Sequence, residues 1–110
     1  MKPASAIKKG KRLEQKIASL MRSKLGNNIA VRMAGSGSGA IKGDVYNRYF
    51  TLEAKNQEKV NLWKFWDQTT AQVQFNKPPV LAISGNNRPI LVVMDINDWL
   101  DLVKEAKCED

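Results

Sequence analysis

The segment KGDVYNRYFTLEAKNQ, residues 42–57, decides the fold because a strand pattern in it carries an unusual set of charged residues. In a β-strand, successive side chains point to opposite faces of the sheet. Leu52 and Ala54 would therefore share an apolar face that can enter a core. Glu53 and Lys55 would share the opposite face, which places a carboxylate and an amine side by side on a sheet surface.

A second carboxylate, Asp44, precedes this strand and can approach the same surface. Mg²⁺ prefers oxygen ligands and is commonly held by one or two protein carboxylates together with phosphate oxygens. Bound there, it would neutralise charge on a phosphodiester and activate water. Lys55 can orient or deprotonate that water, or offset charge in the transition state. The segment thus predicts a Mg²⁺ site, built on Asp44 and Glu53, that cuts phosphodiesters.

The charge of the chain is concentrated near its start. The 110 residues, which are enough for one domain with a modest core, have a net charge of +7. Residues 1–32 hold nine Lys or Arg against a single acid, Glu14, whereas residues 33–110 are nearly balanced. This distribution predicts that the N-terminal segment contacts nucleic acid. A solvated helix face that is merely basic is the alternative.

The residue types that are scarce exclude several chemistries. The sequence has no histidine and one cysteine, Cys108, so a disulfide within the chain and zinc sites built on Cys and His are excluded. Ser-His and Cys-His nucleophile pairs are excluded for the same reason. Cys108 is interpreted as a bystander in a reducing cytoplasm, which is that of the host cell if the protein is viral. No apolar run has membrane-spanning length, and the lysine-rich start lacks a signal-peptide core.

Periodicity and turn residues predict an α/β sandwich around a mixed sheet, in the order helix, three strands, helix, two strands, helix. Gly26 and the asparagines after it should end the first helix, and Asn61 should begin the second. The expected elements are a mobile or partly helical basic arm over 1–11, a helix over 12–25, strands over 29–33, 44–46 and 49–55, a helix over 61–75, strands over 80–84 and 89–94, and a helix from 97 or 98.

Two expectations concern burial. The strands over 80–84 and 89–94 are nearly all apolar, which indicates strands buried on both sides or central in the sheet. The last helix should bury an apolar stripe formed by Trp99, Leu102, Val103 and Ala106.

Three other features have two interpretations each. Glu14 lies at the edge of the first helix's apolar stripe, where a surface residue paired with Lys or Arg is the alternative to a catalytic acid. The Gly/Ser loop over 34–40 can approach a phosphate backbone closely, or it is a plain linker. Trp63, Phe65 and Trp66 can stack on bases, or they form core or a dimer interface.

The pattern GDV–(x6)–LEAK, with Asp44, Glu53 and Lys55, resembles the signature of the PD-(D/E)XK nucleases. Gly43 stands where that signature usually has proline, a position that carries no metal ligand. The predicted order of elements is similar to the αβββαβ core of that superfamily. The resemblance therefore implies a restriction-endonuclease-like α/β fold, in which helices flank a mixed central sheet, over a single nuclease domain of residues 1–110.

Within the superfamily, the chain is most similar to small Holliday-junction resolvases of archaeal and bacteriophage type. Those proteins have a basic first helix with a glutamate, a Gly/Ser-containing segment before the aspartate, and a glutamine on the helix after the E-x-K strand. Glu14, residues 34–43 and Gln68 stand at the corresponding places. This resemblance implies a homodimer in which each subunit cuts one strand of a four-way DNA junction, with no membrane association.

The resemblance also implies a role for each site residue. Asp44 and Glu53 would coordinate Mg²⁺, or Mn²⁺ as a substitute, with help from the backbone carbonyl of Ala54. Glu14 would complete the acidic cluster directly or through water. Lys55 would position the nucleophilic water.

Gln68 would orient that lysine or the scissile phosphate, and one of two loop serines, at 36 or 38, would lie near the active site. The residues expected to contact DNA are Lys8, Lys9, Lys11, Arg12, Lys16, Arg32, Ser36, Ser38 and Lys42. Two alternatives remain open: another endonuclease of the superfamily (nicking, restriction-type or repair), and a basic DNA-binding module without catalysis.

Overall fold

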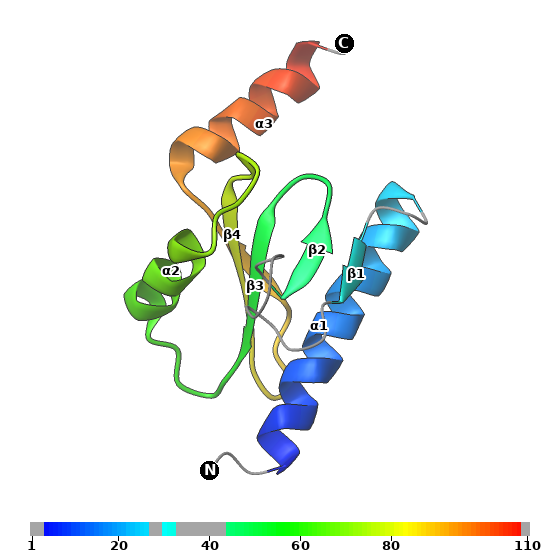
Figure 1. Ribbon diagram of the computed structural model, residues 1–110, viewed down its shortest axis with the longest axis vertical. Coiled ribbons are helices and arrows are strands. Elements are labelled where there is room, and N and C mark those ends of the chain that lie inside the picture. The colour runs from blue at the N-terminus through cyan, green and yellow to red at the C-terminus, as the bar shows by residue number, and fades with distance from the viewer. Residues whose placement is uncertain (1–3, 27–29, 33–43, 109–110) are drawn as a thin grey trace.

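Two helices flank a five-stranded mixed sheet and a third extends away from it in the part of the chain that the structure describes, residues 4–26, 30–32 and 44–108 of a computed structural model (Figure 1). The elements are α1 (Ala4–Leu25), β1 (Ala30–Arg32), β2 (Val45–Asn47), β3 (Thr51–Asn56), α2 (Leu62–Ala71), β4 (Pro79–Ser84), β5 (Leu91–Val93) and α3 (Ile96–Cys108).

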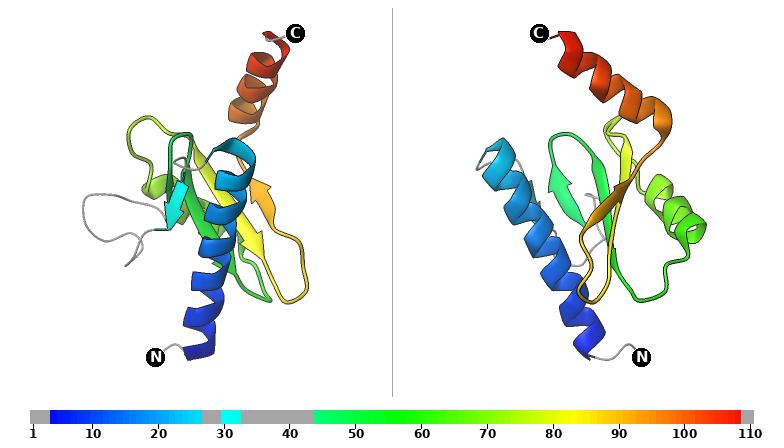
Figure 2. Two further views of the ribbon diagram at one scale, coloured as in Figure 1. Left: turned by 90° about the vertical axis from the view of Figure 1, so that its right-hand side faces the viewer. Right: turned by 180° about the vertical axis from the view of Figure 1, so that it is seen from behind.

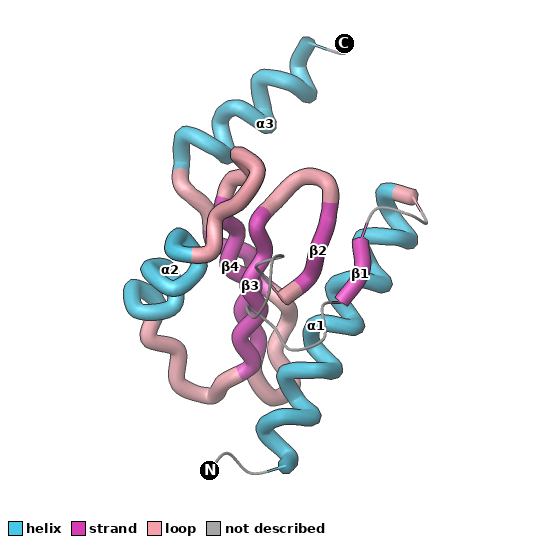
Figure 3. Tube along the Cα trace, viewed as in Figure 1, coloured by secondary structure: helices cyan, strands magenta, loops and turns pink. Residues whose placement is uncertain are grey.

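The sheet has the strand order β1-β2-β3-β4-β5, of which Figure 3 labels the first four strands. Strand β2 runs antiparallel to both β1 and β3, and a crossover through α2 makes β4 parallel to β3. A hairpin then adds β5 antiparallel to β4. This arrangement confirms the predicted restriction-endonuclease-like αβββαβ core and its mixed sheet.

Helix α1 supplies one layer of the core (Figure 2). It begins at Ala4, so the arm predicted over 1–11 is helical from that residue onward. It ends as predicted before Gly26, whose φ of 128° and whose N–H···O bond of 2.9 Å to the Arg22 carbonyl close the last turn. The buried core on this face comprises Leu13, Ile17, Ala18, Val45, Leu52, Ala54 and Ala82.

Helix α2 begins where the sequence predicts, because the Asn61 side chain accepts a hydrogen bond of 3.2 Å from the Lys64 N–H. It ends at Ala71, earlier than the predicted end near Phe75. Phe75 and Asn76 both have φ of 56°, a left-handed conformation that an α-helix cannot continue through. The residue pattern showed the apolar face but not this local reversal of the backbone.

The three aromatic residues of α2 divide between core and surface. Phe65 is buried, Trp66 is half-buried, and Trp63 is 72% exposed. Phe65 is therefore a core residue, in agreement with the interpretation that these aromatic residues pack rather than stack on bases. Trp63 stays available to a base or to another chain.

The C-terminal part corrects two predictions. Strand β4 is central and buried as expected, but β5 is the edge strand of the sheet, and its residues Leu91 and Val92 are 55% and 63% exposed. The stripe expected to be buried on α3 is also exposed, including Trp99 at 53%. Helix α3, which starts at Ile96 rather than at 97 or 98, extends away from the sheet (Figures 1 and 2), so neither α1 nor α2 covers it.

None of the helices in the described ranges is long and apolar enough to cross a membrane.

Candidate active site

The candidate site forms where β2 and β3 separate. The two strands pair only at Val45 with Leu52 and at Tyr46 with Thr51, and the Asp44 N–H extends this ladder by a 2.9 Å bond to the Leu52 carbonyl. The next N–H of β3 that faces β2 belongs to Ala54. It donates to Asp44 Oδ2 at 2.8 Å. The Asp44 carboxylate thus accepts the hydrogen bond of this N–H, which fixes Asp44 beside the middle of β3.

A backbone oxygen is directed into the same gap. In a β-strand the N–H and C=O of one residue point toward the same neighbouring strand. Because the Ala54 N–H points to the Asp44 carboxylate, the Ala54 carbonyl also leaves β3 on the β2 side. The role of this carbonyl as a metal ligand, which the resemblance implies, stays a prediction.

Three carboxyl groups that the sequence singled out are buried, although they come from three elements. Glu14 on α1, Asp44 before β2 and Glu53 on β3 are 8%, 6% and 8% exposed. The pKa of Glu53 is raised to about 8, first by burial, then by the charge and the hydrogen bond of Asp44 and, to a smaller extent, by the charge of Glu14, while Lys55 opposes the shift. Two ionised carboxylates buried side by side repel each other and lack water, so the pair needs either a proton or a bound cation.

Lys55 is held against α2. Its Nζ lies 5.2 Å from the centroid of the Phe65 ring, a cation–π contact that keeps the amine on the Glu53 face of the sheet. Phe65 is a positioning residue that the sequence alone did not assign. The only signal was its helical spacing, which equally fits a core residue. Gln68, one turn further along α2, is exposed, and its contact with Lys55 or with a phosphate stays a prediction.

The donor set suits a hard cation. Asp44, Glu53 and the Ala54 carbonyl present oxygen atoms, the ligands that Mg²⁺ prefers, and Mg²⁺ usually keeps several waters. Among the described residues, no three carboxylate, histidine or cysteine side chains meet closely enough to hold an ion by themselves. Direct ligation by Glu14 therefore stays a prediction, and the pair Asp44–Glu53 forms the centre of the candidate metal site.

The residues predicted to contact DNA fall into three groups. Along α1, Lys9 is half-buried and the side chains of Lys11, Arg12 and Lys16 are exposed. Lys8 and Arg32 lie on described backbone, in α1 and β1. Ser36, Ser38 and Lys42, together with the whole Gly/Ser loop, lie outside the described residues.

Comparison with known proteins bears on the same residues. A family model described as "Phage putative PDDEXK endonuclease" matches residues 5–109, which include the first helix, the acidic pair and Lys55. No curated protein and no solved structure gives a significant match. Since the model spans nearly the whole chain, and the fold and the acid-lysine arrangement agree with it, the protein belongs to this phage family of PD-(D/E)XK endonucleases.

Proposed function

We propose that this protein is a Mg²⁺-dependent, structure-specific endodeoxyribonuclease that resolves four-way DNA junctions as a homodimer. The observation that carries the nuclease part is the Asp44 carboxylate, bound to the Ala54 N–H beside Glu53 and Lys55. Membership of the endonuclease family supports the same activity and, with it, DNA binding.

Each residue of the site has a separate role in the proposed hydrolysis. Mg²⁺, when bound, supplies a positive charge for the phosphate and a water of lowered pKa. Asp44 and Glu53 hold it, with Asp44 fixed in place by the Ala54 N–H. Lys55, restrained by the Phe65 ring, donates hydrogen bonds to the attacking water or to the phosphate oxygens. Burial of both acids strengthens these interactions, since the local dielectric constant is low.

Junction specificity rests on the likeness to small resolvases, which Glu14 and Gln68 support. It is tested by incubating the protein in Mg²⁺ with equal amounts of a four-way junction, a flap, a mismatched duplex and a plain duplex. We expect the junction to be cut first, by paired incisions that leave 5′-phosphates. Equal cutting of all four substrates contradicts the resolvase assignment and favours another endonuclease. Binding without any metal-stimulated cutting favours the non-catalytic module.

The homodimer is supported by the uncovered apolar face of β5 and α3. The exposed residues on one side of α3 are Ile96, Trp99, Leu100 and Val103, and β5 adds Leu91 and Val92, which point to opposite faces of the sheet. An exposed apolar stripe of this kind marks an interaction site, and it can contribute to the roughly 800 Å² that each partner buries in a standard interface.

Charges on α3 favour a second copy in antiparallel orientation. Asp95 lies just before the helix, and Lys104 and Lys107 lie in its C-terminal half. Two antiparallel copies bring Asp95 of one copy toward the lysines of the other, and they also oppose the two helix dipoles. The apolar stripe then meets itself across a two-fold axis, the usual symmetry of protein dimers.

Leu100→Asp should convert the dimer to a monomer, because it places a charge at the centre of the apolar stripe. Sedimentation or light scattering of purified protein measures the change, which should be at least a tenfold rise in the dimer dissociation constant. Leu62→Asp, on an exposed position in the first turn of α2, is the matched control. A monomeric wild type, or a Leu100→Asp variant that stays dimeric, contradicts this interface.

A further inference from the structure

A second basic feature lies at the end of the molecule where α1 starts. The first half of α1 and the β4–β5 hairpin meet there (Figures 1 and 2), and a groove of about 320 Å³ lies between them. Arg12 and Lys16 line it from α1, one helical turn apart, and Arg88 lines it from the hairpin. Polar side chains complete the walls: Asn56, Ser84 and Asn87.

Hydrogen bonds connect the hairpin that carries Arg88 to the segment that directly follows β3. The Gln57 N–H donates to the Ser84 carbonyl at 3.0 Å, and the Asn86 N–H donates to Glu58 Oε1 at 2.9 Å. Within the hairpin, the Ser84 hydroxyl donates to the Arg88 carbonyl at 3.2 Å. These bonds hold the backbone of Arg88 in a defined place relative to β3.

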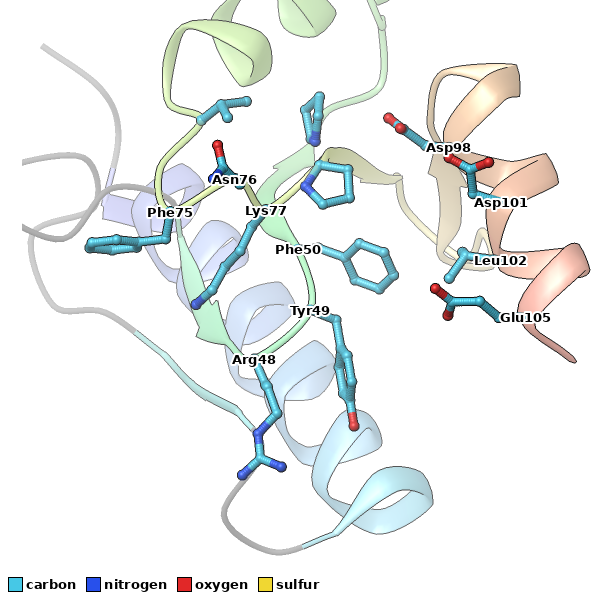
Figure 4. A pocket seen from close by; sticks show the side chains of 13 residues that line it. Arg48, Tyr49, Phe50, Phe75, Asn76, Lys77, Asp98, Asp101, Leu102 and Glu105 are labelled. Carbon is cyan, nitrogen blue, oxygen red and sulfur yellow. The ribbon is translucent and has the colours of Figure 1, made fainter. Parts of the chain in front are cut away.

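The groove differs in charge from a larger cavity near the opposite end of β3. That cavity, of about 700 Å³, is lined by Arg48 and Lys77 on one side and by the acidic residues Asp98, Asp101 and Glu105 of α3 on the other (Figure 4). The groove, in contrast, has no acidic residue in its lining among the described parts of the chain. Three cations that line one groove repel one another; Glu58, which lines the adjacent cavity with Arg88, offsets part of this repulsion, and a bound anion would relieve the rest.

We propose that this groove binds a backbone phosphate of the DNA substrate next to the scissile phosphate, with Arg88 as its main ligand. The assignment rests on the proposed nuclease function and adds a binding site that the N-terminal basic segment alone does not provide. Arginine suits the role because its planar, always charged guanidinium binds two phosphate oxygens at once. Lys16 and Arg12 add charge from the facing helix, and Asn87 adds hydrogen-bond donors.

The position of the groove fits a continuous DNA strand. Asn56, which lines the groove, follows Lys55 by one residue along β3, a rise of about 3.3 Å. Leu13, which also lines it, precedes Glu14 on α1. Because Asn56 and Lys55 point to opposite faces of the sheet, a DNA strand whose scissile phosphate lies at Lys55 passes the groove a phosphate or two away only if it rounds the end of the sheet.

The proposal is tested by comparing Arg88→Ala with Arg48→Ala. Both arginines are exposed and follow a strand in a hairpin turn, but Arg48 faces the acidic cavity. Binding of a junction and of a plain duplex is measured over a range of salt concentrations, with Ca²⁺ in place of Mg²⁺ to prevent cutting. Arg88→Ala should weaken binding roughly tenfold for both DNAs and reduce the slope of log K against log salt by about 1. Arg48→Ala should change neither quantity.

A second measurement identifies the phosphate itself. Single neutral methylphosphonates are placed one at a time along the strand that is cut. One position, within a few nucleotides of the cut, should weaken binding to wild type but not to Arg88→Ala, since the two changes remove the same contact.

The possible outcomes distinguish a failure of the groove proposal from a failure of the nuclease assignment. Wild type that binds and cuts DNA, combined with Arg88→Ala behaving like Arg48→Ala, overturns the groove and leaves the nuclease assignment intact. A methylphosphonate scan in which every position acts alike on wild type and Arg88→Ala overturns it as well. Wild type that binds no DNA overturns both.

Discussion

Lys55→Ala and Glu53→Gln should each lower the rate of DNA cleavage in Mg²⁺ by about 10²–10⁴-fold or more, while DNA binding stays within a fewfold of wild type. Among the described residues, Lys55 is the lysine whose charge acts on Glu53. Its amine lies on the face of β3 that α2 covers. Glu53 provides one of two carboxylates at the centre of the site. Both residues act on the reacting phosphate rather than on the long DNA backbone, so affinity should survive.

The measurement is single-turnover cleavage of a labelled junction, with binding followed separately in Ca²⁺. Lys59→Ala is the matched control for the lysine, because Lys59 lies shortly after β3 and is exposed. Its cleavage rate should remain close to that of wild type. Cleavage that survives both active-site changes would show that the reaction takes place elsewhere on the protein.

The central strand was predictable because two independent constraints act on it. Alternation placed Leu52 and Ala54 on one face and Glu53 and Lys55 on the other, and the core on α1 requires that assignment. For Asp44, the sequence predicted only that the residue lies close to this strand, and not how its carboxylate is held. Its bond to the Ala54 N–H depends on β2 leaving β3 after a short ladder, which is a tertiary feature that local sequence does not encode.

The wrong predictions about burial have a common cause. An apolar pattern reports that a face avoids water, but not which surface covers it. Strand β5 and helix α3 have such patterns and remain exposed in this chain, so the expected central strand and buried stripe were wrong. Glu14 shows the opposite case. Its place at the stripe's edge left two interpretations open, and burial beside the acid pair follows only from how α1 packs on the sheet.

Charge at the acid pair makes the stability of the metal-free protein depend on pH. The pKa of Glu53 rises from an ordinary 4.5 to about 8, mainly through burial. Between these values the folded protein keeps a proton that the unfolded chain releases. With respect to this group, the free energy of unfolding is therefore highest below pH 4.5 and falls as the pH rises to about 8, by at most about 1.4 kcal/mol per pH unit.

Glu53→Gln should remove this dependence, since the amide is neutral at every pH. The melting temperatures of variant and wild type should be similar near pH 4. At pH 9 in EDTA the variant should melt higher by on the order of 5 °C. Glu58→Gln is the control, because Glu58 is exposed and has no resolved pKa shift. Parallel melting curves for Glu53→Gln and wild type from pH 4 to pH 9 would contradict a buried, protonated Glu53.

Mg²⁺ should reverse the loss of stability in wild type alone. A cation bound by Asp44 and Glu53 competes with the proton on Glu53, so below pH 8 the affinity for Mg²⁺ should fall by up to tenfold for each pH unit. Millimolar Mg²⁺ should then raise the melting temperature of wild type more at pH 9 than at pH 6, because stabilisation grows with the ratio of ligand to dissociation constant. The Glu53→Gln variant should show a small shift that does not change with pH. A pH-independent shift in wild type would mean that the metal binds without displacing this proton, and therefore away from Glu53.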